Sequence, residues 1–290
     1  MDAVANALLD PFRDGIGQRA LLEVLILSAV CGPLGVWIVL YRQSYAAESI
    51  SHAALPGLVL ASVTAIPLGV GAAAGLAVAS ICVAAATRIR SISADVAVAV
   101  TVTALFGLGT LLALSPSVPP RLGELLFGDP LSVSGSDLAA SAALAALVVI
   151  ALAILHRPLT LVGFDPQTAP SLGARPAGVE TALLLLLALT ILVAIQALGN
   201  LLVVAILISP AATALRAGRG LRSALALSAG IAAACGIAGL YASYYLDTAA
   251  GASIALAMVV AFALTLPFER TASTARRPPR SPVEALGGGR

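Results

Sequence analysis

The sequence predicts an all-α, polytopic integral membrane protein with about eight transmembrane helices, two of them broken near residues 56 and 210. The 290-residue chain is 60% hydrophobic and 10% charged, with a mean hydropathy of +1.03, whereas soluble domains carry roughly 25% charged residues. Many apolar runs approach the length of about 20 residues that crosses a bilayer as a helix. The connections are short and contain Pro or Gly, which favours one compact membrane domain. A water-soluble enzyme is excluded.

Seven apolar runs are long enough for complete crossings: residues 20–41, 67–87, 94–115, 138–156, 181–198, 225–246 and 253–268. Two shorter runs are interrupted, 51–66 by Pro56 and Gly57 and 201–215 by Pro210, so we expect each to bend or break within the membrane. This divides the chain into an N-terminal segment (1–19), a transmembrane domain (20–268) and a disordered, Arg- and Pro-rich cytoplasmic tail (269–290).

All 16 basic residues are arginines, and they recur at alternate connections. The three clusters are Arg88 with Arg90, Arg157 with Arg175, and Arg216 with Arg219 and Arg222. Short cytoplasmic loops collect basic residues, so these connections and the tail are predicted to face the cytoplasm of a multi-pass cell-membrane protein. Nine crossings would then place the N-terminus outside, and eight would place it inside.

Glu48 and His52 are the sharpest candidates for a functional site, because ionisable groups within membrane spans tend to be functional or paired. Their spacing of four places them on one helical face, and a carboxylate with an imidazole suits a divalent transition metal. Pro56 has no N–H, so the carbonyl of His52 loses its usual helical partner, and Gly57 removes bulk beside it. The alternative is an interfacial pair whose side chains bond each other or a nearby serine.

Other polar groups point to packing or to a pathway. Gln196 and Asn200 are again four residues apart and either line a polar path or bond between helices. Glu23 and His156 are expected at water interfaces near the ends of their spans. The chain has no HExxH, no GxSxG and no lysine for a phosphate-binding GxxxxGK[ST] loop, so it is not expected to be an enzyme, and any ATP hydrolysis belongs to a separate chain.

Four ordered blocks resemble the membrane permease subunits of ABC transporters that import zinc or manganese. They are GVWIVLYRQSYAAESISHAALPG at 35–57, LLFGDPLSVSGSDL from Leu125, VGFDPQTAPSLG from Val162 and GNLLVVAILISPAATALRAG from Gly199. The resemblance covers nearly the whole chain up to Phe268 and implies that Glu48 and His52 are metal ligands. The family usually has aspartate where Glu48 stands, which puts the pocket size and metal preference in question.

The resemblance also implies the partners. These are a second copy of the permease, cytoplasmic ABC ATPase subunits, an extracytoplasmic metal-binding protein and membrane lipid, with no nucleic acid. No permanently bound cofactor is expected, only the transported divalent metal, zinc or manganese, with a slight preference for zinc. The segment 210–222 resembles the connection that contacts the ATPase, with coupling residues Pro210, Ala211, Ala212, Thr213, Arg216 and Arg219.

Two other functions compete with this one. A proton-coupled secondary transporter of a small solute or metal would use Glu48 as its carrier and would need no ATPase. A membrane scaffold that transports nothing would tolerate the loss of His52.

Overall fold

The computed structural model describes residues 10–64, 66–89, 91, 93–114, 134–198, 200–217 and 220–266, with backbone alone at 68, 195–198, 200 and 201. The described chain is helical and contains no strand, which confirms the all-α prediction. In chain order the elements are η1 (Asp10–Phe12), α2 (Gly15–Leu40), α3 (Ser44–His52), α4 (Leu55–Thr64), α5 (Leu68–Ala86), α6 (Ala94–Ala113), α7 (Gly135–Phe164), η4 (Ala169–Leu172), α8 (Pro176–Leu198), α9 (Asn200–Arg216), α10 (Leu221–Leu246) and α11 (Ala250–Thr265).

Seven segments of the described chain are long and apolar enough to cross a bilayer. They are Gly15–Leu40, Ser44–Thr64, Gly69–Ala86, Ala94–Ala113, Gly135–Phe164, Pro176–Ala194 and Leu221–Leu246. Two shorter apolar helices, Leu202–Arg216 and Ala250–Thr265, complete the set. Each of these segments overlaps one apolar run predicted from the sequence, with two differences. Ser44–Thr64 begins well before the predicted short run 51–66, so most of α3 lies outside that run, and Ala250–Thr265 is shorter than the complete crossing predicted at 253–268. The protein is a multi-pass membrane protein.

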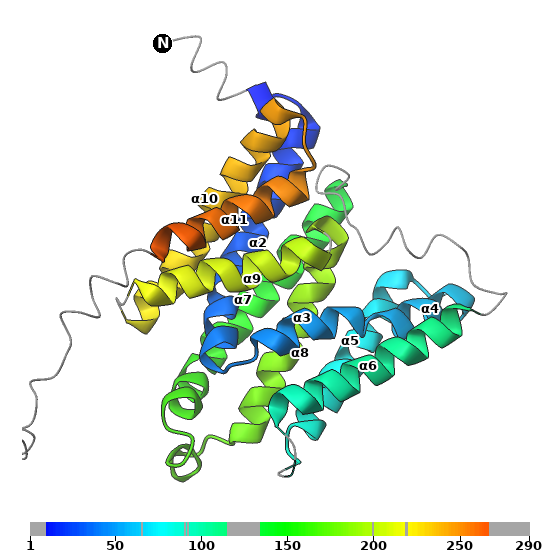
Figure 1. Cartoon of the computed structure of the whole chain (residues 1–290), viewed down its shortest axis with the longest axis vertical. Helices are drawn as coiled ribbons and strands as arrows, with labels where there is room; N and C mark the ends of the chain where they lie inside the picture. Colours follow the sequence, from blue (N-terminus) through cyan, green and yellow to red (C-terminus); the bar gives the residue numbers. More distant parts are fainter. Residues whose placement is uncertain are drawn as a thin grey trace, which may run out of the picture.

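Helix α2 is the centre of the larger helix group in Figure 1, where it packs against α7, α9 and α10. Small residues allow this close approach, as the four-residue spacing of Ser28 and Gly32 predicts. A Cβ atom at Gly32 would lie 2.5 Å from the backbone nitrogen of Ala229 in α10, and one at Gly35 would collide with the carbonyl of Leu207 in α9. Backbone-to-backbone packing therefore fixes the position of α2.

Helices α2 and α10 run antiparallel. The ring of Phe12, just before α2, contacts Tyr241 late in α10 at 5.3 Å between centroids, whereas Gly32 accepts a 2.9 Å hydrogen bond from the Ser228 hydroxyl nearer the start of α10. At the opposite end, the Tyr41 hydroxyl after α2 donates to the Leu159 carbonyl of α7 at 2.8 Å. The start of α2 therefore lies with the end of α10, and the end of α2 lies with the start of α10 and the last turns of α7.

Two expected interfacial residues lie deeper than predicted. Glu23 is 0% exposed, because α2 begins at Gly15 and the glutamate lies two turns inside it. His156 is half-buried, because α7 continues to Phe164 rather than ending at the histidine. The apolar runs located the helices correctly but placed these two helix ends too close to the ionisable residues.

The predicted break near Pro56 is present. Helix α3 ends at His52 and α4 begins at Leu55, with a turn at 53–54 between them. Proline is tolerated here because the first turn of a helix has unbonded N–H groups in any case. Gly57 lies against α5, where an added Cβ would be 2.8 Å from the backbone nitrogen of Gly75. Pro56 and Gly57 thus shape the packing of α4 immediately after the candidate histidine.

The predicted interruption at Pro210 is absent, since α9 continues as a helix from Asn200 to Arg216. Proline within a membrane helix is tolerated where hydroxyl groups and neighbouring helices satisfy the local backbone. Here the Thr213 hydroxyl donates to the Ser209 carbonyl at 2.8 Å, and the Ser209 hydroxyl donates to the Met258 carbonyl of α11 at 2.7 Å. Side-chain hydrogen bonding around Pro210 therefore accompanies a continuous helix.

Candidate functional site

Helix α3 presents Glu48 and His52 on one face, as their spacing predicts. Both side chains are exposed, whereas Ala47, Ile50 and Ser51 are buried on the other side of the helix. Helix α3 contacts α6 most extensively, and it also contacts α2, α5, α8 and α9. Packing of α3 in this orientation turns the carboxylate and the imidazole away from the interior of the chain.

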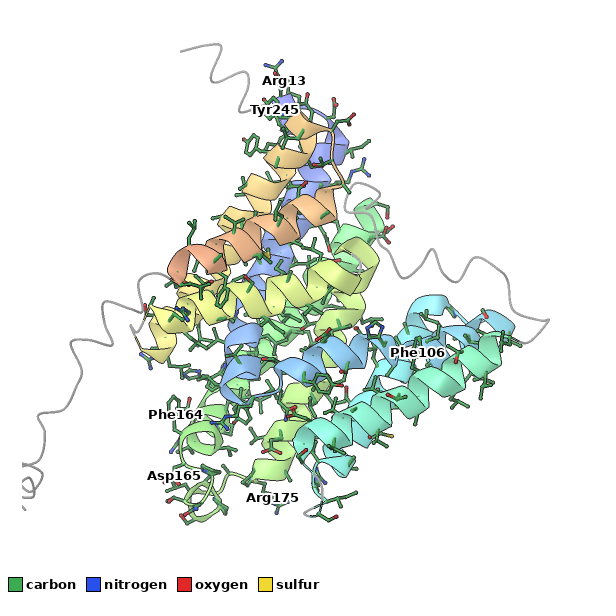
Figure 2. The ribbon with its side chains drawn as sticks, viewed as in Figure 1. Arg13, Phe106, Phe164, Asp165, Arg175 and Tyr245 are labelled. Atoms are coloured by element: carbon green, nitrogen blue, oxygen red, sulfur yellow. The ribbon has the colours of Figure 1, made fainter. Side chains whose placement is uncertain are left out.

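The His52 imidazole lies against Phe106 of α6. The two rings meet edge to face, with centroids 6.1 Å apart and an interplanar angle of 78°. Phe106 is labelled in Figure 2, on α6, which contacts both α3 and α4. This contact holds one side of the imidazole and leaves its nitrogens available. Sequence reasoning missed Phe106, because spacing within one helix gives no information about a ring on another helix.

Neither group of the candidate pair is bound within the chain as far as the structure describes it. The one hydrogen bond at Glu48 that involves a side chain runs from the Ser51 hydroxyl to the Glu48 backbone carbonyl, at 2.8 Å. The described residues contain no bond between the Glu48 carboxylate and either the His52 imidazole or a nearby serine. The interfacial-pair alternative required such a bond, whereas a ligand site requires free lone pairs.

The described residues hold no group of three or more His, Cys, Asp or Glu side chains that could bind a metal. Glu48 and His52 therefore offer two protein ligands. Zinc, calcium and magnesium ions in proteins have total coordination numbers of four to eight, water included. A metal on this face would need water, backbone oxygens or a second protein surface to complete its coordination.

The predicted pathway residues Gln196 and Asn200 lie at the α8–α9 junction, the first near the end of α8 and the second at the start of α9. Their side chains lie outside the described residues, as does Gly199 between them. The polar path stays a prediction.

The predicted coupling residues divide into two groups. Pro210, Ala211 and Thr213 are buried and Ala212 is half-buried, all within α9. Ala211 lies against α2, where a Cβ added at Gly35 would be 3.2 Å from the Cβ of Ala211. These four residues thus lie inside α9, and Ala211 packs this helix against α2.

Arg216 ends α9 and connects it to α11. Its guanidinium lies 5.7 Å from the ring centroid of Phe262 and donates to the Thr265 carbonyl at 3.3 Å. Arg219 lies outside the described residues. Of the described coupling candidates, Arg216 alone lies at the end of a helix.

The α7–α8 connection forms a second surface at the end of the bundle that carries Arg175 (Figure 2). Phe164 and Leu172 are exposed there, at 66% and 61%. Hydrogen bonds from the side chain and backbone of Thr168 lower the pKa of Asp165, so its carboxylate stays charged and holds the turn before η4. This connection falls within the VGFDPQTAPSLG block, but the block alone did not indicate which side chains would be exposed.

The chain matches the model of a known family and several characterised transporters. Residues 14–269 match the ABC 3 transport family. The chain is 33% identical over 252 residues to the manganese transport system membrane protein MntC of Halalkalibacterium halodurans, covering 87% of this chain and 86% of MntC. It is 27% identical over 266 residues to the chelated iron transport system membrane protein YfeD of Yersinia pestis, covering 92% of this chain and 90% of YfeD.

A solved structure has the same fold. The PsaBC complex of Streptococcus pneumoniae, determined with a Fab, contains a chain that superimposes with a TM-score of 0.78 at 29% identity. The match covers 90% of this chain and 95% of that one. Because the family model spans nearly the whole membrane domain, the chain belongs to the ABC 3 transport family.

Proposed function

We propose that this protein is the permease subunit of an ATP-driven importer for a divalent first-row transition metal, manganese or iron, with Glu48 and His52 as ligands. The observation that carries the proposal is the α3 face, where a carboxylate and an imidazole one turn apart are exposed. Relatives that match most of the chain are named for manganese and for chelated iron transport, which favours these metals over the zinc that the sequence slightly preferred.

The donor chemistry supports this metal class. Calcium and magnesium prefer oxygen ligands alone, so an imidazole nitrogen disfavours them. A mixed oxygen and nitrogen site accepts manganese, iron and zinc, and it binds the first two more weakly than zinc according to the usual affinity order. Weak binding suits a transport site, because the ion must leave as well as enter.

The proposed importer needs three kinds of partner. It has no lysine and therefore no GxxxxGK[ST] loop, so a separate ATPase subunit would supply the energy. A second permease copy, with its own α3 face opposed to the first, would raise the number of protein ligands from two to four. An extracytoplasmic metal-binding protein would deliver the ion. Arg216 and the α7–α8 connection are the proposed contacts for the ATPase.

Replacement of His52 by alanine tests the proposal directly. Metal uptake by cells should be almost completely lost while the amount of protein in the membrane stays at the wild-type level, because one of two protein ligands is gone. Isotope uptake and immunoblotting of membranes measure the two quantities. Wild-type uptake by the variant would contradict the site.

A reconstitution experiment separates this proposal from a proton-coupled secondary transporter. Liposomes that contain the permease alone should show no metal flux under a proton gradient, whereas addition of the ATPase subunit, the metal-binding protein and ATP should produce transport. Gradient-driven flux through the permease alone would overturn the ABC importer.

A further inference from the structure

A slot on the outside of the bundle, between α2, α7 and α10, has no role in the proposed metal pathway. Its volume is about 160 Å³. Ala29, Pro33 and Trp37 of α2 line one side, Ala153 and His156 of α7 line another, and Leu225 of α10 closes it. The buried Trp37 ring meets the His156 imidazole edge to face, with centroids 5.7 Å apart. Apart from that imidazole, the side chains that line the slot are apolar.

The slot opens toward lipid. Ala29 and Ala153 on its walls are exposed, and neighbouring α7 residues carry large exposed apolar side chains, Ile150 at 57% and Ile154 at 74%. In a multi-pass membrane protein, such a face of a spanning helix contacts acyl chains unless another protein covers it.

Two arginines stand at one end of the slot. Arg157 follows Ala153 by four residues in α7, and Arg222 precedes Leu225 by three in α10, so each lies one turn beyond a lining residue on the same helix face. Both are exposed. The last turns of α7 and the first turns of α10 both lie near the end of α2. Both arginine side chains are therefore at the same end of the slot. Within the described chain, neither arginine has an ion pair or hydrogen bond through its side chain.

We propose that this slot binds an anionic phospholipid, with an acyl chain between α2, α7 and α10 and the headgroup phosphate between Arg157 and Arg222. The arginine clusters mark this end as cytoplasmic, and the cytoplasmic leaflet carries the anionic lipids that basic pockets between helices attract. Guanidinium groups match phosphate oxygens in bidentate geometry. The apolar walls complement the hydrocarbon of a lipid, which free phosphate lacks. The site is independent of metal transport.

Native mass spectrometry of the full-length permease, with phosphatidylglycerol or phosphatidylcholine of identical chains, tests the site. Phosphatidylglycerol should stay bound to the wild-type protein more strongly than phosphatidylcholine. The Arg157→Gln/Arg222→Gln variant should lose affinity for phosphatidylglycerol by more than ten-fold, about five-fold for each arginine, and keep its affinity for phosphatidylcholine. Arg175→Gln removes an exposed arginine from the α7–α8 connection and should leave both lipids unaffected.

Two further arms identify the occupant. Ala153→Phe fills the slot without changing a charge and should displace phosphatidylglycerol, and inorganic phosphate should not compete for it. A phosphatidylglycerol with a photoreactive acyl chain, added to the wild-type protein, should label peptides of α2, α7 or α10 at the slot, which tests the site even if a variant misfolds. The proposal would be overturned if the double variant and the wild type retained phosphatidylglycerol equally, or if inorganic phosphate competed for the site. It would also be overturned if the photoreactive lipid labelled only other regions, or if cross-linked dimers showed a second copy of the chain in the slot.

Discussion

At the scale of residues, Glu48 stands where the family pattern that the sequence resembles usually has aspartate. It lies on the exposed face of α3 with His52 one turn further on. Glutamate has one methylene more than aspartate, so its carboxylate reaches further from the helix and has an additional rotatable bond. In the proposed metal site, the added reach would favour a larger or more adaptable coordination shell, which suits manganese better than a metal that demands short tetrahedral bonds.

Shortening this side chain should change metal preference rather than abolish transport. Glu48→Asp keeps the carboxylate, so we expect uptake to continue with a shifted ratio of manganese to zinc in competition experiments. Glu48→Gln removes the charge and should lower metal affinity by more than the 10- to 100-fold typical of outer-shell changes. Asp95→Asn, at an exposed acid in the first turn of α6, is the control. Wild-type metal binding by Glu48→Gln would remove Glu48 from the site.

Phe106 should act as a positioning residue for His52, because its ring is the described aromatic contact of the imidazole. Phe106→Ala should weaken metal binding by about two- to ten-fold, the equivalent of one aromatic pair, and Phe106→Tyr should largely restore it. Leu108→Ala, at another exposed apolar residue of α6, should have no effect. Calorimetric titration of the purified protein with manganese checks the series. An affinity unchanged by Phe106→Ala would show that the ring contact does not orient the ligand.

At the scale of elements, the sequence could predict what depends on local chemistry and could not predict what depends on packing between helices. Apolar runs located the described membrane helices except α3, most of which precedes the predicted run 51–66, and the proline and glycine after His52 located the α3–α4 break. Pro210 likewise lacks an N–H, yet α9 is continuous there, and the hydrogen bond from Ser209 to Met258 of α11 beside it is a tertiary feature that the local sequence does not give. The spacing of Glu48 and His52 predicted a shared face, but the exposure of that face and the approach of Phe106 depend on how α3 packs.

Glycine contacts between helices give the clearest element-level prediction. Gly35→Ala would place a Cβ against the Leu207 carbonyl and force α2 away from α9, so we expect a loss of about 1–3 kcal/mol in stability. Gly107→Ala is the matched control, because an added Cβ there meets nothing within 4 Å, and it should be neutral or stabilising by up to about 1 kcal/mol. Thermal unfolding in detergent compares the two variants. Equal melting temperatures would contradict backbone-to-backbone packing of α2 and α9.

At the scale of the whole molecule, the antiparallel contact of α2 with α10 brings the start of α2 and the end of α10 to the same side of the bundle. The start of α2 lies with Tyr241 and the α10–α11 turn, and α10, which carries Arg222 in its first turn, begins shortly after Arg216 at the end of α9. Arg88, after α5, donates to the Ala177 carbonyl at the start of α8, so those two helix ends also meet. If the arginine-bearing connections face the cytoplasm, then α2 begins on the outer side, which corresponds to an odd number of crossings.

Thiol accessibility tests this orientation in intact cells. In a background where Cys31, Cys82 and Cys235 are replaced by alanine, single cysteines would be introduced at exposed positions. Gln18→Cys at the start of α2 and Thr248→Cys in the α10–α11 turn should react with a membrane-impermeant maleimide from outside. Arg175→Cys in the α7–α8 connection should react only after permeabilisation, because the impermeant reagent cannot reach the cytoplasmic face. The antiparallel contact would be contradicted if Gln18→Cys were labelled only after permeabilisation while Thr248→Cys was labelled from outside. If all three results were inverted, the cytoplasmic placement of the arginines would be wrong, but the packing of α2 with α10 would still hold.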